Sequence, residues 1–148
     1  MISSASEANF SVETPLADLP LVAARIAEQL KKSTPSPFVL WLVGDLGAGK
    51  TTFTGALLHA LGLAKSVPVL SPTFTYLTEY NTPVGAIAHM DLYRLVEGDL
   101  DSVESLLSGR QFRGLVVEWP QRAEGSPYLE KTHEIQFDFS KTENTRVL

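Results

Sequence analysis

The chain has 148 residues, 44% of them apolar, which is the size and composition of one domain with a buried core and excludes a disordered tail. It contains no cysteine, so disulfides, thiolate zinc sites and a cysteine nucleophile are excluded. Its 12 basic and 17 acidic residues give a net charge of −5, and tight binding of nucleic acid by this chain alone is not expected, because such affinity comes mostly from neutralised phosphates.

No membrane-spanning or export segment is expected. The longest unbroken apolar stretch, Phe38 to Val43, has six residues, whereas a membrane helix needs about 20. The N-terminus lacks the basic region and apolar run of an export signal. We therefore expect a cytoplasmic protein with one domain over residues 1–148, of which residues 1–9 are flexible.

The first half of the chain is predicted to alternate between strands and helices. A short edge strand is expected at Phe10–Thr14. Apolar residues recur at helical spacing over residues 19–32, with Asp18 as a candidate cap and two lysines that suit the helix end. Phe38–Val43 is apolar on both faces, as a central parallel strand should be. A glycine-rich turn leads from it into a predicted helix over Lys50–Leu61.

The second half has less regular periodicity. Four further strands are predicted, at Phe74–Tyr80, Gly85–Asp91, Gly114–Trp119 and Glu134–Phe139. A turn at Asn81–Pro83 separates the first two, and Asp99–Leu107 is predicted to be helical. Strands interleaved with helices indicate an α/β fold with a mixed, mostly parallel sheet flanked by helices.

A phosphate-binding loop follows the first buried strand. The pattern G-x-x-x-x-G-K-[ST] is matched by Gly44, Asp45, Leu46, Gly47, Ala48, Gly49, Lys50 and Thr51. Its glycines let successive backbone amides converge on phosphate oxygens at a helix start, where the helix dipole adds to the attraction. Lys50 would reach the β- and γ-phosphates, Thr51 would ligate Mg²⁺, and Thr52 is placed for the α-phosphate. The sequence therefore predicts a single P-loop NTPase domain.

The metal site of such a domain needs a carboxylate at the end of a buried strand, and two residues qualify. Glu118 ends the apolar run Leu115–Val117, which is the Walker B arrangement with Glu in place of Asp, and Asp91 ends a less apolar run. No Asn-Lys-x-Asp element for guanine is present, so ATP is the default nucleotide. The residues alone leave open which acid binds the metal and which activates water.

Three further residues carry weaker signals. Thr73 lies in a Ser-Pro-Thr segment, where a hydroxyl would sense the γ-phosphate, although the segment also fits an ordinary turn. Trp119 would lie over the nucleotide or pack in the core, and His89 would orient Asp91 or be a core histidine. No His-x-x-His or Glu-x-x-His pair indicates a transition-metal site.

Four motifs occur together along the chain. They are GDLGAGKTT (residues 44–52), SPTFTYLTEY (71–80), HMDLYRL (89–95) and VVEWPQR (116–122). In this order and spacing the chain resembles the TsaE family, the small bacterial ATPases of tRNA threonylcarbamoyladenosine synthesis. The resemblance covers about residues 10–148. It rests on the combination of the four motifs, because the phosphate loop alone does not distinguish one P-loop family from another.

The resemblance implies a compact P-loop domain that binds ATP and Mg²⁺ and hydrolyses ATP slowly alone. It implies TsaD and TsaB as partners, with which ATP turnover supports formation of the modified adenosine at position 37 of tRNAs that read codons starting with A. Contact with tRNA would then be indirect. By motif, Lys50 holds phosphates, Thr51 and Glu118 ligate the metal, Asp91 supports hydrolysis, and Thr73 belongs to a switch-like loop.

Two other functions fit a P-loop domain. The runner-up is a small metabolite kinase that transfers phosphoryl to an alcohol or acid, and the third is a nucleotide-binding module in which neither acid activates water. A kinase usually closes an arginine-bearing lid over the phosphates, whereas the second half of this chain has scattered arginines and no arginine-rich insertion. Arg94 would stabilise phosphate charge or face a partner. We therefore expect an accessory ATPase.

Overall fold

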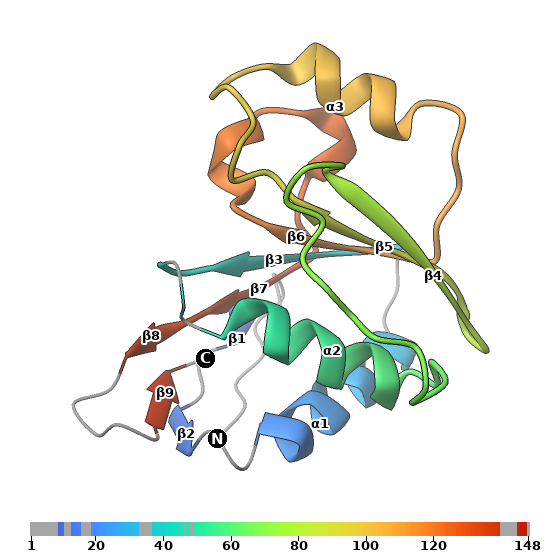
Figure 1. Cartoon of the computed structure of the whole chain (residues 1–148), viewed down its shortest axis with the longest axis vertical. Coiled ribbons are helices and arrows are strands. Elements are labelled where there is room, and N and C mark those ends of the chain that lie inside the picture. Colours follow the sequence, from blue (N-terminus) through green and yellow to red (C-terminus); the bar gives the residue numbers. More distant parts are fainter. Residues whose placement is uncertain are drawn as a thin grey trace.

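The computed structural model describes residues 9–10, 13–15, 19–32, 37–45, 47, 49–139 and 145–147. These residues form a six-stranded main sheet, with helices on both faces, and a separate small sheet of three strands. Figure 1 shows helices α1 and α2 on one face of the main sheet and α3 on the other. This is the α/β arrangement with a mixed sheet that the sequence predicts.

The strands of the main sheet lie in the order β1-β7-β3-β6-β5-β4. Their bounds are Asn9–Phe10 (β1), His133–Gln136 (β7), Phe38–Val43 (β3), Gly114–Glu118 (β6), Gly85–Asp91 (β5) and Leu77–Thr82 (β4). Neighbouring strands are parallel except β4 and β5, which form an antiparallel hairpin. The carboxyl ends of β3, β6 and β5 therefore lie next to one another, and open α/β sheets bind ligands at such an edge.

Two helices, α1 (Leu19–Lys32) and α2 (Lys50–Ala60), cover one face of the sheet. Their apolar side chains pack with those of β3, β5, β6 and β7 in one core cluster, to which Ile26, Phe53 and Leu57 belong. This packing fixes the start of α2 against the carboxyl ends of the strands. Asp18, the predicted cap of α1, lies outside the described residues.

The opposite face is covered by α3 (Leu100–Leu107) and two short 3₁₀ segments, Pro120–Ala123 and Pro127–Leu129. The side chain of Asp99 accepts a hydrogen bond from the Ser102 amide and so caps α3. Among all the residues that the structure describes, no helix is both long and apolar enough to cross a membrane.

The hairpin strand β4 differs from its prediction. It begins at Leu77 rather than Phe74, because Tyr76 lies in a turn with a left-handed backbone conformation (φ 67°) that ends the loop before the strand. The predicted turn at Asn81–Pro83 is also shorter, since β4 continues through Thr82 and pairs with β5 over that length.

The predicted strands near the two ends of the sequence each divide in two. Residues 10–14 contribute to β1 in the main sheet and to β2 (Glu13–Pro15) in the small sheet. Residues 134–139 contribute to β7 and then to β8 (Asp138–Phe139). The small sheet has the order β2-β9-β8, with β9 at Thr145–Val147 and both pairings antiparallel. A single continuous strand was therefore the wrong prediction at both places.

Gly114, the first residue of β6, lies against the buried ring of Phe38. A Cβ at Gly114 would overlap this ring, which the surrounding core holds in place. We expect Gly114→Ala to lower the free energy of unfolding, measured by urea denaturation, by about 1–3 kcal/mol. The matched control is Gly55→Ala within α2, where the added Cβ makes an ordinary contact with Val69 and should stabilise by about 0.5–1 kcal/mol. Equal stability of the two variants would contradict this packing.

Candidate nucleotide site

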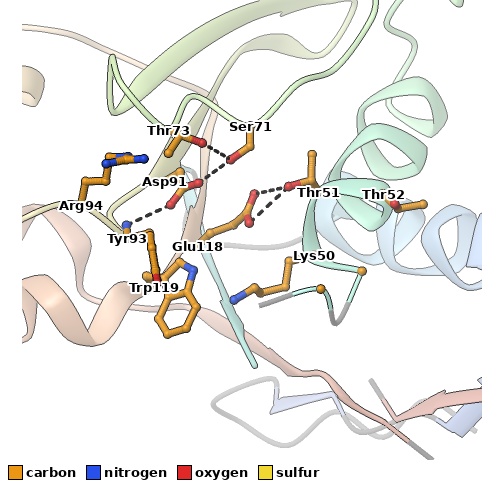
Figure 2. Close-up of a pocket in the computed structure, with 12 residues that line it drawn as sticks. Lys50, Thr51, Thr52, Ser71, Thr73, Asp91, Tyr93, Arg94, Glu118 and Trp119 are labelled. Carbon is orange, nitrogen blue, oxygen red and sulfur yellow. Dashed lines mark hydrogen bonds between the residues drawn. The ribbon is translucent and has the colours of Figure 1, made fainter. Parts of the chain in front are cut away.

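A pocket of about 460 Å³ lies where α2 begins and where β5 and β6 end. Most of its lining residues have polar or charged side chains, and Figure 2 shows these side chains gathered from separate segments of the chain. The lining residues are Gly47, Gly49, Lys50, Thr51, Thr52, Ser71, Thr73, Asp91, Tyr93, Arg94, Glu118 and Trp119. Residues from all four sequence motifs therefore meet in one place.

The glycine-rich turn brings the backbone into position at the start of α2. Gly47 and Gly49 have positive φ angles of 77° and 97°, which residues with a Cβ rarely adopt. Gly49 has no side chain to cap α2, which leaves the first amides of the helix for a ligand. Asp45 is exposed and does not line the pocket. Leu46 and Ala48, also predicted to bind the nucleotide, lie outside the described residues.

Lys50 is a buried cation, with 4% of its surface exposed. Its Nζ donates a hydrogen bond to the Gly44 carbonyl oxygen at 2.5 Å and lies 3.9 Å from the centroid of the Trp119 ring. Burial lowers the pKa of Lys50 from its ordinary value, although nearby carboxylates, first among them Glu118, act in the opposite direction. Phosphate oxygens would be stronger acceptors for this ammonium than a carbonyl and a ring face.

Thr51 and Glu118 face each other in the pocket (Figure 2). The Thr51 hydroxyl lies 3.2 and 3.4 Å from the two carboxylate oxygens of Glu118. Glu118 is the last residue of β6 and is 3% exposed. The chain leaves the strand at once, because Trp119 has a left-handed backbone conformation (φ 58°) and Pro120 begins a 3₁₀ segment. This turn places the tryptophan ring beside the phosphate loop.

Asp91 ends β5 and is paired in register with Glu118 on the neighbouring strand. Both of its oxygens accept hydrogen bonds, Oδ2 from the Ser71 hydroxyl and Oδ1 from the Tyr93 amide at 2.9 Å. Thr73 Oγ1 lies 3.5 Å from Ser71 Oγ, which connects the predicted switch-like segment to the same carboxylate (Figure 2). Asp91 is therefore a buried acid with a fixed orientation.

Three contacts of the site were not predicted from the sequence. His89 donates its hydrogen bond to Glu118 and not to Asp91. Glu118 is its diagonal neighbour on β6, within reach of a long side chain, whereas the two oxygens of Asp91 already accept hydrogen bonds from other groups. Ser71 and Tyr93 were not recognised as partners of Asp91. The Tyr93 contact has a sequence signal, since an aspartate at a strand end often accepts from the amide two residues later.

Aromatic and basic side chains also lie at the pocket, which Tyr93, Arg94 and Trp119 line and Phe74 does not. The guanidinium of Arg94 lies 4.5 Å from the ring centroid of Phe74, and both side chains are exposed. The Tyr93 ring packs against the Trp119 ring, with 5.0 Å between centroids. Thr52 is exposed at the same pocket. A cation beside aromatic rings suits a ligand that carries both negative charge and a planar group.

The oxygen atoms in the pocket suit a hard divalent cation. Two buried carboxylates, Glu118 and Asp91, share the lining with the Thr51 hydroxyl and with one buried ammonium, that of Lys50. Among the described residues, no three His, Cys, Asp or Glu side chains are grouped so as to hold a metal. This donor set fits Mg²⁺, which is usually bound by one or two carboxylates together with substrate phosphates and water.

Comparisons with known proteins agree on one family. The family model described as "Threonylcarbamoyl adenosine biosynthesis protein TsaE" matches residues 17–148. The chain is 42% identical over 98 residues to the tRNA threonylcarbamoyladenosine biosynthesis protein TsaE of Aquifex aeolicus, a match that covers 66% of this chain and 69% of that protein. The protein of the same name from Bacillus subtilis is 46% identical over 84 residues, which are 55% of this chain and 49% of that protein.

A similar solved structure matches a larger share of this chain than the two sequence relatives do. The crystal structure of Bacillus subtilis YdiB superposes with a TM-score of 0.65 at 28% sequence identity and covers 93% of this chain and 82% of that one. The sequence matches are shorter and span about half to two thirds of the length of the curated relatives.

Proposed function

The chain belongs to the TsaE family of threonylcarbamoyl adenosine biosynthesis proteins, and from this premise we propose that it is a Mg²⁺-dependent ATPase that is slow alone. It acts with TsaD- and TsaB-type partners in forming threonylcarbamoyladenosine at position 37 of tRNAs that read codons starting with A. The partners stimulate its turnover, and it works in the cytoplasm.

The observation that carries this proposal is the meeting of a phosphate loop with two strand-end carboxylates in one pocket. The phosphates bind the amides at the start of α2, where the helix dipole favours negative charge. Lys50 exchanges the Gly44 carbonyl for β- and γ-phosphate oxygens, which are charged and therefore better acceptors. Trp119, already beside Lys50, packs over the bound nucleotide.

The two acids have different roles in this proposal. Mg²⁺, when bound with the nucleotide, neutralises charge on the β- and γ-phosphates. Thr51 and Glu118 are the residues that would hold it, and their oxygens already lie within hydrogen-bond distance. Asp91 supports hydrolysis by orienting the attacking water, a role that suits a carboxylate held by Ser71 on one oxygen and a backbone amide on the other. Ser71 connects the switch-like loop to this acid, and the Thr73 hydroxyl contacts that serine.

The charge of the chain supports indirect contact with tRNA. A protein that bound tRNA by itself would need a basic surface to neutralise phosphates, and this chain has a net charge of −5. The partners therefore supply the tRNA-binding surface, and the ATPase supplies a nucleotide-dependent step.

The test is ATP turnover of the purified protein alone and with TsaD and TsaB. We expect the partners to raise turnover by at least about tenfold, which corresponds to about 1.4 kcal/mol of barrier. Lys50→Ala serves as the control for contaminating ATPases and should give no stimulated turnover. Unstimulated turnover would contradict the proposal. A phosphorylated product from small hydroxylated acceptors, without partners, would favour a metabolite kinase instead.

A further inference from the structure

A buried hydrogen bond connects Glu118 to a residue outside the phosphate loop. His89 of β5 is fully buried, and its Nε2 lies 2.5 Å from Glu118 Oε2. Because an ionised carboxylate only accepts hydrogen bonds, Nε2 carries the hydrogen and donates it. Glu118 thus lies between two donors, the imidazole of His89 on β5 and the hydroxyl of Thr51 on α2.

The second ring nitrogen of His89 indicates what this side chain contributes. Nδ1 is buried and has no hydrogen-bond partner in the described part of the structure. A buried polar atom without a partner is unfavourable. An apolar side chain of similar size would fill the same space and avoid this cost. The histidine therefore contributes a hydrogen-bond donor to Glu118, which an apolar residue would lack.

The position of His89 separates it from the ligand-binding surface. In the register of β5 and β6, Asp91 lies opposite Glu118, whereas His89 lies opposite Val116, two residues earlier. His89 has no exposed surface and is absent from the lining of the pocket. It can therefore act on a ligand only through Glu118, which does line the pocket.

We propose that His89 is a positioning residue that holds the Glu118 carboxylate in the orientation in which, with Thr51, it binds Mg²⁺ together with the nucleotide. This inference rests on the proposed function. A glutamate has several rotatable bonds, and a donor behind a metal-binding carboxylate restricts them, as outer-shell partners commonly do in metal sites.

The test is the affinity of a non-hydrolysable ATP analogue, measured by calorimetry in EDTA and in Mg²⁺. In His89→Leu, the gain in affinity on adding Mg²⁺ should fall by about 10- to 100-fold, while the affinity in EDTA stays at the wild-type value. His89→Gln should keep the gain, because its amide nitrogen can occupy the place of Nε2. His89→Asn should lose it, because its shorter side chain cannot reach Glu118. The matched control is Met90→Leu at the neighbouring position, whose side chain packs in the core on the α3 face of the sheet.

The outcomes separate this inference from the proposed function. A full Mg²⁺-dependent gain in His89→Leu would overturn the positioning role alone. Equal losses in the Gln, Asn and Leu variants would also overturn it, because packing and not the donor would then be responsible. If His89→Leu does not fold, the contrast between Gln and Asn decides. A wild-type protein that binds the analogue without any gain from Mg²⁺ would remove both the proposed metal role and the inference, and one that does not bind it would remove the proposed function.

Discussion

Lys50→Ala is expected to abolish measurable ATP binding. In the proposed complex the Lys50 ammonium donates charge-assisted hydrogen bonds to the β- and γ-phosphates, in a pocket where it is buried and little screened by water. Hydrogen bonds to charged groups contribute about 1.5–3 kcal/mol each. Loss of two of them should weaken ATP binding by at least about 100-fold, which isothermal titration calorimetry measures directly.

The Lys50 variant should remain folded, so that its effect on binding can be interpreted. Alanine is a good helix former at the first position of α2, and burial already disfavours the charged form of Lys50, as its lowered pKa indicates. Lys65→Ala is the matched control, because Lys65 is exposed and outside the pocket, and it should bind ATP like the wild type. Wild-type affinity in a folded Lys50→Ala protein would remove the phosphate-loop assignment.

Glu118→Gln should separate nucleotide binding from hydrolysis. The substitution keeps the size of the side chain and an oxygen acceptor for Thr51 but removes the charge proposed to hold the metal. Because a catalytic metal ion stabilises the transition state by several kcal/mol, partner-stimulated turnover should fall by about 100-fold or more. ATP affinity in EDTA should stay within about threefold of the wild type. Steady-state phosphate release and calorimetry measure the two quantities.

The control for this charge change is Glu130→Gln, at an exposed glutamate outside the pocket. It removes one negative charge without touching the site, so turnover should match the wild type. A Glu118→Gln protein that keeps full Mg²⁺-dependent turnover would refute the metal assignment and leave nucleotide binding intact.

The strongly periodic segments of the fold were predictable from local sequence. The helix over residues 19–32 and the strand Phe38–Val43 have the predicted bounds, because their apolar patterns are distinct and polar or glycine-rich segments flank them. The start of β4 was not predictable, since Tyr76 adopts a left-handed conformation that non-glycine residues seldom show. The small sheet was not predictable either, because β2 and β9 pair across almost the whole chain.

The site was predictable at the level of motifs and not at the level of contacts. A strand followed by a glycine-rich turn and Lys50 indicates phosphate binding, and acids at strand ends such as Asp91 and Glu118 belong at the same edge of a parallel sheet. The contacts between individual side chains of the site depend on the pairing of β5 with β6 and on the register of these two strands. The contact of His89 with Glu118 follows from that pairing, which no local pattern encodes.

A crystal structure with a non-hydrolysable ATP analogue and Mg²⁺ tests the central claim most directly. The account predicts phosphates against the amides of the turn between Gly44 and Lys50, Lys50 Nζ on the β- and γ-phosphates, and oxygens of Thr51 and Glu118 at the metal ion. An analogue bound elsewhere on the protein, with that turn left empty, would contradict it.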